Sequence, residues 1–124
     1  MSKPFTPRPE HCENDVAYNI CTWMRMQGWI PNRNPVARLF TVDGRPHPVG
    51  RRGACDWRFS RSAKYPISYI EIEMKAPGKK PSKKQREYMA SLKSLGVVAV
   101  WFDSFAKFEG WYRVVMHSET YAAV

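Results

Sequence analysis

Three residues of types that can bind a metal ion and move protons lie on two short segments in the middle of the chain. Asp56 lies in the alternating segment Ala54–Phe59, and Glu73 and Lys75 lie in the segment Tyr69–Lys75. If both segments are β-strands, side chains two residues apart share a face, so Glu73 and Lys75 lie about 7 Å apart along one face. Two carboxylates at close range repel each other unless a cation lies between them, and hard oxygen ligands suit Mg²⁺ or Mn²⁺. An amine beside such an ion could hold or deprotonate a bound water, and these residue types together are what phosphodiester hydrolysis requires.

The second of these segments has two very different faces. One face is apolar and needs a core, whereas the other carries two carboxylates and an ammonium group, which leave water only when they are paired or bound to metal. An edge strand with a solvated polar face explains the same pattern, so both interpretations stay open on this segment alone. The apolar face consists of Ile70, Ile72 and Met74, and the polar face of Tyr69, Glu71, Glu73 and Lys75.

The hydrophobic periodicities of the chain predict one domain over residues 1–124, with an α/β fold in which a mixed sheet is flanked by helices. The predicted order is α-β-β-β-α-β-α. Residues 1–9 contain three prolines and are expected to form an extended arm. The other predicted elements are a helix at 10–27, a loop at 29–35, a strand at 36–42, a turn at Asp43-Gly44, a loop at 45–53, strands at 54–59 and 69–75 joined as a hairpin, a helix from Ser82 ended by Gly96, a strand at 97–102 and a helix to about 116.

Two interpretations apply to Gln85, which lies near the start of the helix predicted from Ser82. With Ser82 as N-cap, Gln85 stands at the position that completes a capping box. It also falls on the stripe predicted to be buried, where an unpaired amide is costly, and this favours a role in a site. Tyr88, one helical turn later, is expected to pack in the core. The predicted buried stripe consists of Tyr88, Met89, Leu92 and Leu95.

The charge of the chain favours a polyanionic partner. Lys and Arg number 20 against 11 Asp and Glu, giving a formal net charge of +9, which most often indicates nucleic acid. Cys12, Cys21 and Cys55 are odd in number and form no CxxC pair, so we expect reduced thiols and a cytoplasmic protein (host cytoplasm if viral). We expect no membrane association, because no signal peptide and no apolar run of transmembrane length are evident.

A family resemblance rests on the acids and on what surrounds them. Asp56, a gap of sixteen residues, then Glu73-Met74-Lys75 resembles the motif of the PD-(D/E)XK nucleases. The following Ala76-Pro77-Gly78-Lys79-Lys80-Pro81 and Gln85 resemble more narrowly the VRR-NUC family of that superfamily. Gly50-Arg51-Arg52-Gly53 before the first acid, and Leu95-Gly96 before an apolar strand that ends in Asp103-Ser104, are similar to that family too.

The resemblance implies a restriction-endonuclease-like fold and a role for each residue of the motif. Asp56, Glu73 and the backbone carbonyl of Met74 would bind Mg²⁺ or Mn²⁺, Lys75 would be the catalytic lysine, and Gln85 would support the site. The first helix of the superfamily often supplies a further glutamate. Glu13 is the first candidate for this ligand and Glu10 the second, although stabilisation of the helix dipole explains both acids equally well.

The activity implied by the resemblance is that of a Mg²⁺-dependent, structure-selective DNA endonuclease. Small stand-alone members resemble Holliday-junction-resolving enzymes of bacteriophages and act as homodimers, so branched DNA and a second copy of the chain are the expected partners. The alternative is a basic nucleic-acid-binding module without catalysis, and RNA as the substrate stays open. Trp101, Phe108, Trp111 and Tyr112 suit either a dimer interface or the core. The expected phosphate contacts, each also explained as solvated surface, are Arg51, Arg52, Lys79, Lys80, Lys83 and Lys84.

The chain departs from the family pattern in three places. Cys55 precedes the first acid where the family usually has proline, and cysteine is small enough to fit. Glu71 stands where an apolar residue is usual, and we expect it to face solvent, with an outer metal contact as the alternative. The segment Thr41–Val49 resembles an insertion between the first strand and the basic loop.

Overall fold

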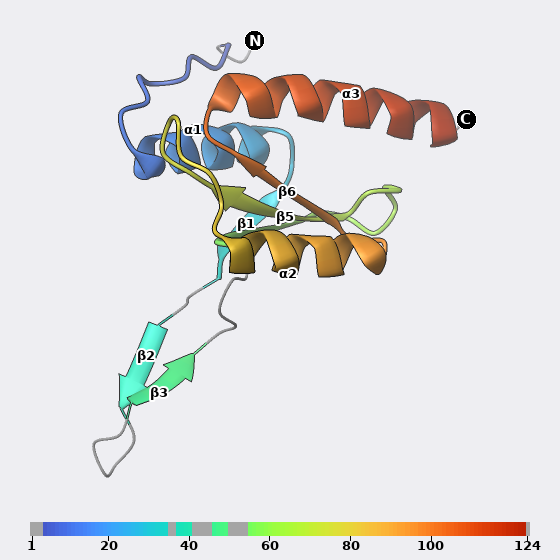
Figure 1. Cartoon of the computed structure of the whole chain (residues 1–124). Helices are drawn as coiled ribbons and strands as arrows, with labels where there is room; N and C mark the ends of the chain where they lie inside the picture. Colours follow the sequence, from blue (N-terminus) through green and yellow to red (C-terminus); the bar gives the residue numbers. More distant parts are fainter. Residues whose placement is uncertain (1–3, 35–36, 41–45, 50–54, 124) are drawn as a thin grey trace.

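The computed structural model describes the backbone of residues 4–34, 37–40, 46–49 and 55–123, and the side chains of 4–34 and 55–117. Figure 1 shows the central sheet between α1 and α3 on one side and α2 on the other. The elements are α1 (Glu13–Met26), β1 (Ile30–Arg33), β2 (Ala37–Phe40), β3 (Pro46–Val49), β4 (Trp57–Ser60), β5 (Tyr69–Met74), α2 (Lys83–Ser94), β6 (Val98–Phe102) and α3 (Phe105–Ala123).

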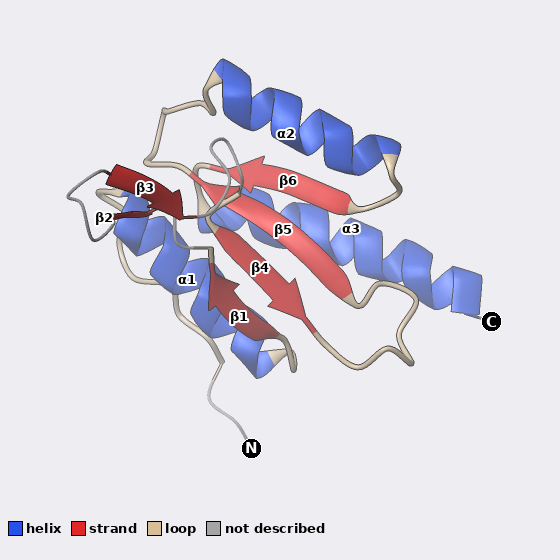
Figure 2. Cartoon of the chain, turned by 90° about the horizontal axis from the view of Figure 1, so that it is seen from below, coloured by secondary structure: helices blue, strands red, loops and turns tan. Residues whose placement is uncertain are grey.

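The central sheet has four strands in the order β1-β4-β5-β6. β1 pairs with β4 and β4 with β5 in antiparallel fashion, whereas β5 and β6 are parallel. Parallel neighbours need a crossover connection, and α2 provides it between β5 and β6. Figure 2 shows α2 lying beside β6. The predicted α/β fold with a mixed sheet is therefore confirmed, including the order α-β-β-β-α-β-α for the helices and the strands of this sheet.

The strand that opens this sheet is not the one predicted. The loop predicted at 29–35 contains β1, and the strand predicted at 36–42 contains β2, which pairs with β3 in a separate two-stranded sheet. β3 lies in the segment predicted as a loop at 45–53. β1 gives no alternating signal because it is a four-residue edge strand whose Ile30 is 63% exposed, and its Pro31 is tolerated because edge strands need fewer backbone donors. The predicted turn at Asp43-Gly44 lies outside the described residues.

The apolar face of β5 lies in the main core. Ile70, Ile72 and Met74 are fully buried against side chains of α1 and α3. The polar face of β5 is covered as well, because α2 and a second cluster that contains Cys55, Tyr88 and other residues lie on that side. A solvated edge strand is therefore ruled out for β5, which lies between β4 and β6.

α2 begins and ends as predicted, with Ser82 as its N-cap and with Gly96, at a φ of +83°, directly after its C-cap. The Ser82 hydroxyl accepts the Gln85 N–H at 3.2 Å and the Gln85 Oε1 accepts the Ser82 N–H at 2.8 Å, forming the capping box. The helix ends at Ser94, so Leu95 is the C-cap and is 78% exposed, contrary to its predicted place in the buried stripe. Tyr88 and Met89 are buried as predicted.

Candidate metal centre

The pairing of β4 with β5 brings the two predicted acids together. Trp57 lies opposite Ile72 in the antiparallel register, so one step further along places Asp56 opposite Glu73 on the same face. The backbone N–H of Asp56 donates a hydrogen bond of 3.1 Å to Glu73 Oε2. This contact fixes the start of β4 against the acid of β5.

A third carboxylate comes from the first residue of α1. Oxygen atoms of Glu13, Asp56 and Glu73 all lie within 4.8 Å of one another, a spacing that one cation could bridge. Glu10, the second candidate, lies elsewhere: its carboxylate accepts the backbone N–H of Phe105 at 3.0 Å and the Asn19 amide at 3.1 Å. Glu10 therefore caps the start of α3, where a carboxylate suits the positive end of the helix.

Lys75 and Gln85 both contact the same oxygen of Glu73. The Lys75 ammonium lies 3.6 Å from Glu73 Oε1, and the Gln85 amide donates a hydrogen bond of 2.8 Å to that atom. Both interpretations of Gln85 are therefore realised at once, since one end of its amide caps α2 and the other holds Glu73. Met74 sends its side chain into the core, and its carbonyl as a metal ligand stays a prediction.

The electrostatics of the cluster disfavour three bare carboxylates. Glu73 is only 1% exposed, and burial, followed by repulsion from Asp56, raises the pKa of Glu73 to about 7 although Lys75 opposes the rise. Burial and Asp56 also raise the pKa of Glu13 above its ordinary value. A divalent cation would relieve this repulsion, and the all-oxygen donor set fits Mg²⁺ or Mn²⁺.

Glu71 does not face solvent, and that expectation is wrong. Its side chain is 4% exposed, and its two oxygens accept hydrogen bonds from Tyr69 at 2.8 Å and Tyr88 at 2.9 Å. Tyr88 thus packs in the second cluster as predicted but also donates a bond that the sequence did not suggest. The contacts of Glu71 are phenolic hydroxyl groups from β5 and α2, so it braces α2 against the sheet beside Glu73.

Further contacts near the site were not foreseen. Asn34 follows β1 and donates its N–H to the Asp56 carbonyl at 2.6 Å, while its side-chain oxygen accepts Arg58 at 3.2 Å. Asp103 follows β6 and accepts the Gly78 N–H at 3.1 Å, which holds the turn between β5 and α2. Gly78 adopts a φ of +82°, a backbone conformation that favours glycine. The sequence gives no sign of the Asn34 contact, because this contact depends on β1. Asp103 belongs to the family resemblance, which does not indicate its bond to Gly78.

The predicted phosphate contacts on α2 and the turn before it are all exposed. They lie on the connection from Lys75 into α2, close in sequence to the acid cluster, and consist of Lys79, Lys80, Lys83 and Lys84. Arg51 and Arg52, the other two predicted contacts, lie outside the described residues. Of the four aromatic residues considered for an interface, Phe108 and Tyr112 are buried in the core, whereas Trp101 and Trp111 are half-buried.

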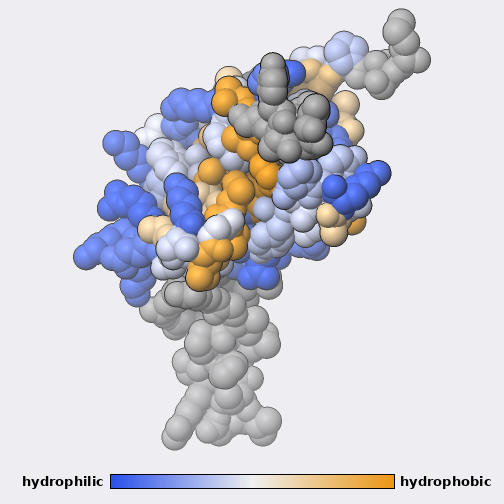
Figure 3. Space-filling model, turned by 90° about the vertical axis from the view of Figure 1, so that its right-hand side faces the viewer, coloured by the Kyte–Doolittle hydropathy of each residue, from blue (hydrophilic) through white to orange (hydrophobic). Residues whose placement is uncertain are grey.

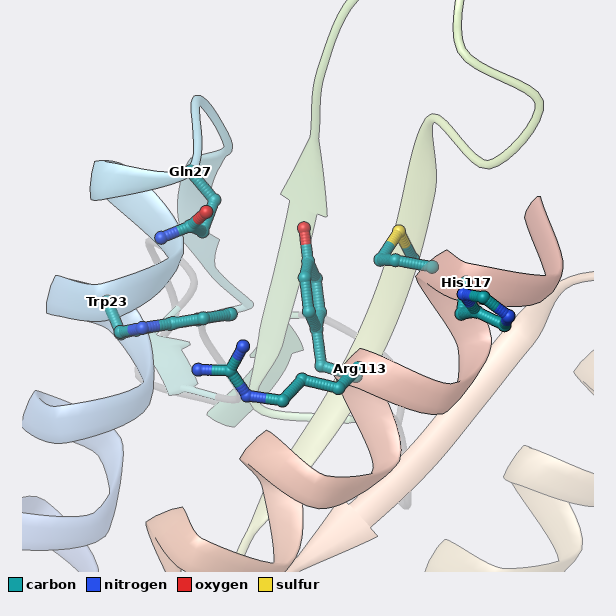
Figure 4. A pocket seen from close by; sticks show the side chains of 6 residues that line it. Trp23, Gln27, Arg113 and His117 are labelled. Atoms are coloured by element: carbon teal, nitrogen blue, oxygen red, sulfur yellow. The ribbon is translucent and has the colours of Figure 1, made fainter. Parts of the chain in front are cut away.

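A separate pocket of about 330 Å³ lies between the end of α1 and the middle of α3 (Figure 4). Its lining includes Trp23, Gln27, Arg113 and His117. Glu13 and Gln27 are fourteen residues apart along α1, which corresponds to about 21 Å at the rise of an α-helix. This pocket is therefore remote from the acid cluster and contributes nothing to it.

Comparison with protein-family models, with curated proteins and with solved structures finds no match for this chain. Among the described residues, no helix combines the length and the apolar character that crossing a membrane requires.

Proposed function

We propose that this protein is a metal-dependent, structure-selective DNA endonuclease of the VRR-NUC type that hydrolyses phosphodiester bonds, with Holliday junctions as the expected substrate class. One observation carries the proposal: three carboxylates from α1, β4 and β5 converge within 4.8 Å. The lysine of the proposed motif and a supporting glutamine contact one of them, Glu73. Acids, an amine and a positioning amide are the groups that this hydrolysis needs.

Each residue of the cluster has a proposed task. Asp56, Glu73 and Glu13 would hold Mg²⁺ or Mn²⁺, joined by the Met74 carbonyl. The chemistry that such an ion supplies is a lower pKa of bound water and polarisation of a phosphate oxygen. Lys75 orients a water or a phosphate oxygen through its ammonium group and can exchange a proton with it. Gln85 keeps the Glu73 carboxylate in one orientation by donating to Oε1.

The exposed lysines and the start of α2 support DNA as the ligand. Lys79, Lys80, Lys83 and Lys84 are exposed and lie close in sequence to Glu73 and Lys75, and contacts to phosphate position a duplex without reading its sequence. Arg51 and Arg52 belong to the same proposed surface. Selectivity for DNA shape rather than for sequence follows from this type of contact.

A homodimer and a cytoplasmic location are further parts of the proposal. Two copies related by a twofold axis would place two cleavage sites symmetrically on a four-way junction. Figure 3 shows a face on which hydrophobic residues form a band between hydrophilic flanks, and such a band suits contact between copies. The described thiols, Cys12, Cys21 and Cys55, are all free, in keeping with a reducing compartment.

The direct test incubates the purified protein with labelled four-way, flap and linear duplex DNA, and with RNA, in Mg²⁺ or in chelator. We expect Mg²⁺-dependent cleavage of branched DNA that Asp56→Ala and Lys75→Ala abolish. Glu109→Gln, which changes an acid of α3 paired with Arg113 at 3.3 Å, is the matched control and should retain activity. The absence of any divalent-dependent product from all substrates would overturn the proposal.

The basic surface by itself favours a second candidate, a nucleic-acid-binding module without catalysis. The four exposed lysines would then bind DNA with strong salt dependence. In that case Asp56→Ala and Lys75→Ala leave DNA binding unchanged, and no product forms in Mg²⁺. The same assay therefore separates the two functions.

A further inference from the structure

A groove along α1 takes no part in the functions assigned so far. It has a volume of about 260 Å³ and lies between one side of α1 and Trp57, the first residue of β4. Asn14, at one end of the groove, follows Glu13 on α1, so this end lies next to one of the three carboxylates. Trp57 projects from the face of β4 opposite to that of Asp56. Arg25 lines its other end, eleven residues along α1 from Asn14, or about 16 Å. The remaining lining residues are Ala17, Tyr18, Cys21 and Thr22.

The lining of the groove combines aromatic rings with positive charge. Tyr18 is 49% exposed and Trp57 is half-buried, so parts of both rings are accessible. Arg25 is exposed at the far end of the groove and supplies the positive charge. Arg8, which pairs with Asp15, lies 4.0 Å from the centre of the Tyr18 ring and covers one face of it. Aromatic side chains with nearby cations are the combination that binds single-stranded nucleic acid, because bases stack on the rings while the cations attract the backbone.

We propose that this groove binds an unpaired nucleobase of the DNA strand whose phosphate lies at the acid cluster. A base inside a duplex has both faces covered by its neighbours, so only a base that is single-stranded or turned out of the stack can lie on Tyr18 or Trp57. This inference rests on the proposed nuclease function and narrows its substrate. The preferred DNA contains an unpaired nucleotide next to the cleaved bond, as flaps, bulges and open junctions do.

The test measures binding in chelator, where cleavage does not interfere, with two probes: a single-stranded oligothymidine and a blunt duplex. We expect Tyr18→Ala to weaken oligothymidine binding by roughly 5- to 100-fold, the range that loss of one stacking contact gives. Duplex binding should stay within about twofold, because the lysines near α2 remain. Tyr65→Ala is the matched control, since Tyr65 is a tyrosine of similar exposure, 42%, in the connection between β4 and β5.

A second variant addresses Trp57, which also packs against the main core. Trp57→Phe keeps an aromatic ring in the core but presents a smaller surface to the groove. A photoreactive thymidine analogue in the oligonucleotide should cross-link to Tyr18 or Trp57, and peptide mass spectrometry identifies the residue. Cross-linking only to residues outside the groove would contradict the assignment.

The two proposals fail in different ways. If the wild type does not bind oligothymidine, or if Tyr18→Ala changes both probes equally or neither, the groove proposal is wrong while Mg²⁺-dependent cleavage can still be observed. If no substrate is cleaved but Tyr18→Ala selectively weakens oligothymidine binding, the groove binds single strands and the nuclease proposal is the one that fails.

Discussion

Gln85 donates a hydrogen bond of 2.8 Å from its amide to Oε1 of Glu73, while its own oxygen accepts the N–H of Ser82. One side chain therefore joins the N-terminal cap of α2 to the most buried acid of the cluster. Because Lys75 contacts the same Glu73 oxygen at 3.6 Å, a displaced Glu73 would also displace the ammonium group. The N-terminal cap of α2 and the acid cluster are therefore linked through a single side chain.

The first prediction separates these two roles of Gln85. Ser82→Ala removes the hydroxyl that caps the Gln85 N–H but leaves the contact between Gln85 and Glu73. Gln85→Ala keeps that hydroxyl cap and removes the two side-chain bonds of Gln85, to the Ser82 N–H and to Glu73. Ser82→Ala should lose about 1 kcal/mol of unfolding free energy from the cap, measured from urea denaturation. Only Gln85→Ala should lower Mg²⁺-dependent cleavage markedly, by about tenfold or more. Equal effects on cleavage would mean that Gln85 is only a cap residue.

The second prediction concerns the pH dependence of stability in the metal-free protein. The pKa of Glu73 is about 7 in the folded state against an ordinary value of 4.5, so between these values the folded state holds a proton that the unfolded state has released. This contribution to stability is fully present below pH 4.5 and is lost as pH rises through 7. It amounts to roughly 3 kcal/mol.

Glu73→Gln isolates this contribution. In chelator, the unfolding free energy of the wild type should fall relative to that of Glu73→Gln as pH is raised from about 5 to 8. Chemical denaturation at each pH measures the difference. Parallel pH profiles for the two proteins would show that Glu73 titrates normally.

The third prediction concerns the response to metal. A cation that binds only the folded state stabilises it by about 2.7 kcal/mol at a hundredfold excess over Kd. Mg²⁺ or Mn²⁺ should therefore raise the Tm of the wild type, and Asp56→Asn or Glu13→Gln should reduce that rise. Asp15→Asn is the control, because Asp15 lies in the same turn of α1 but pairs with Arg8 at 3.1 Å instead of joining the cluster. A metal response that all variants share would place the ion elsewhere.

The sequence predicted the site better than it predicted the edge of the sheet. The spacing from Asp56 to Glu73 is the length of one hairpin, and alternation along β5 is regular, so both acids could be assigned to one face. β1 has no such pattern, since Pro31 and Asn32 interrupt it and only one neighbouring strand covers it. The contacts of Asn34 with the start of β4 depend on the pairing of β1 with β4, for which the sequence has no pattern.

Burial of a polar side chain was the harder property to predict. Glu71 and Glu73 are identical in type and lie two residues apart, yet one contacts tyrosine hydroxyls and the other the acid cluster. Alternation gives the face of a side chain but not what covers that face. Tyr88, the partner of Glu71 on α2, is distant from it in sequence. An aromatic residue on the buried stripe of a helix predicts packing in the core but not a hydrogen bond to a particular acid.

The last prediction concerns the salt dependence of DNA binding. Each lysine that contacts a phosphate releases a counterion, so the plot of log K against log salt has a slope of about −0.9 per contact on duplex DNA. Lys79→Gln combined with Lys80→Gln should make this slope less steep by about 1.8 and weaken binding equally for all sequences. Lys64→Gln, which changes a lysine in the connection between β4 and β5, should leave the slope unchanged. The comparison depends only on binding, so it tests the lysine surface even in a protein that has lost Asp56. An unchanged slope in the double variant would show that the turn before α2 is not part of the DNA-binding surface.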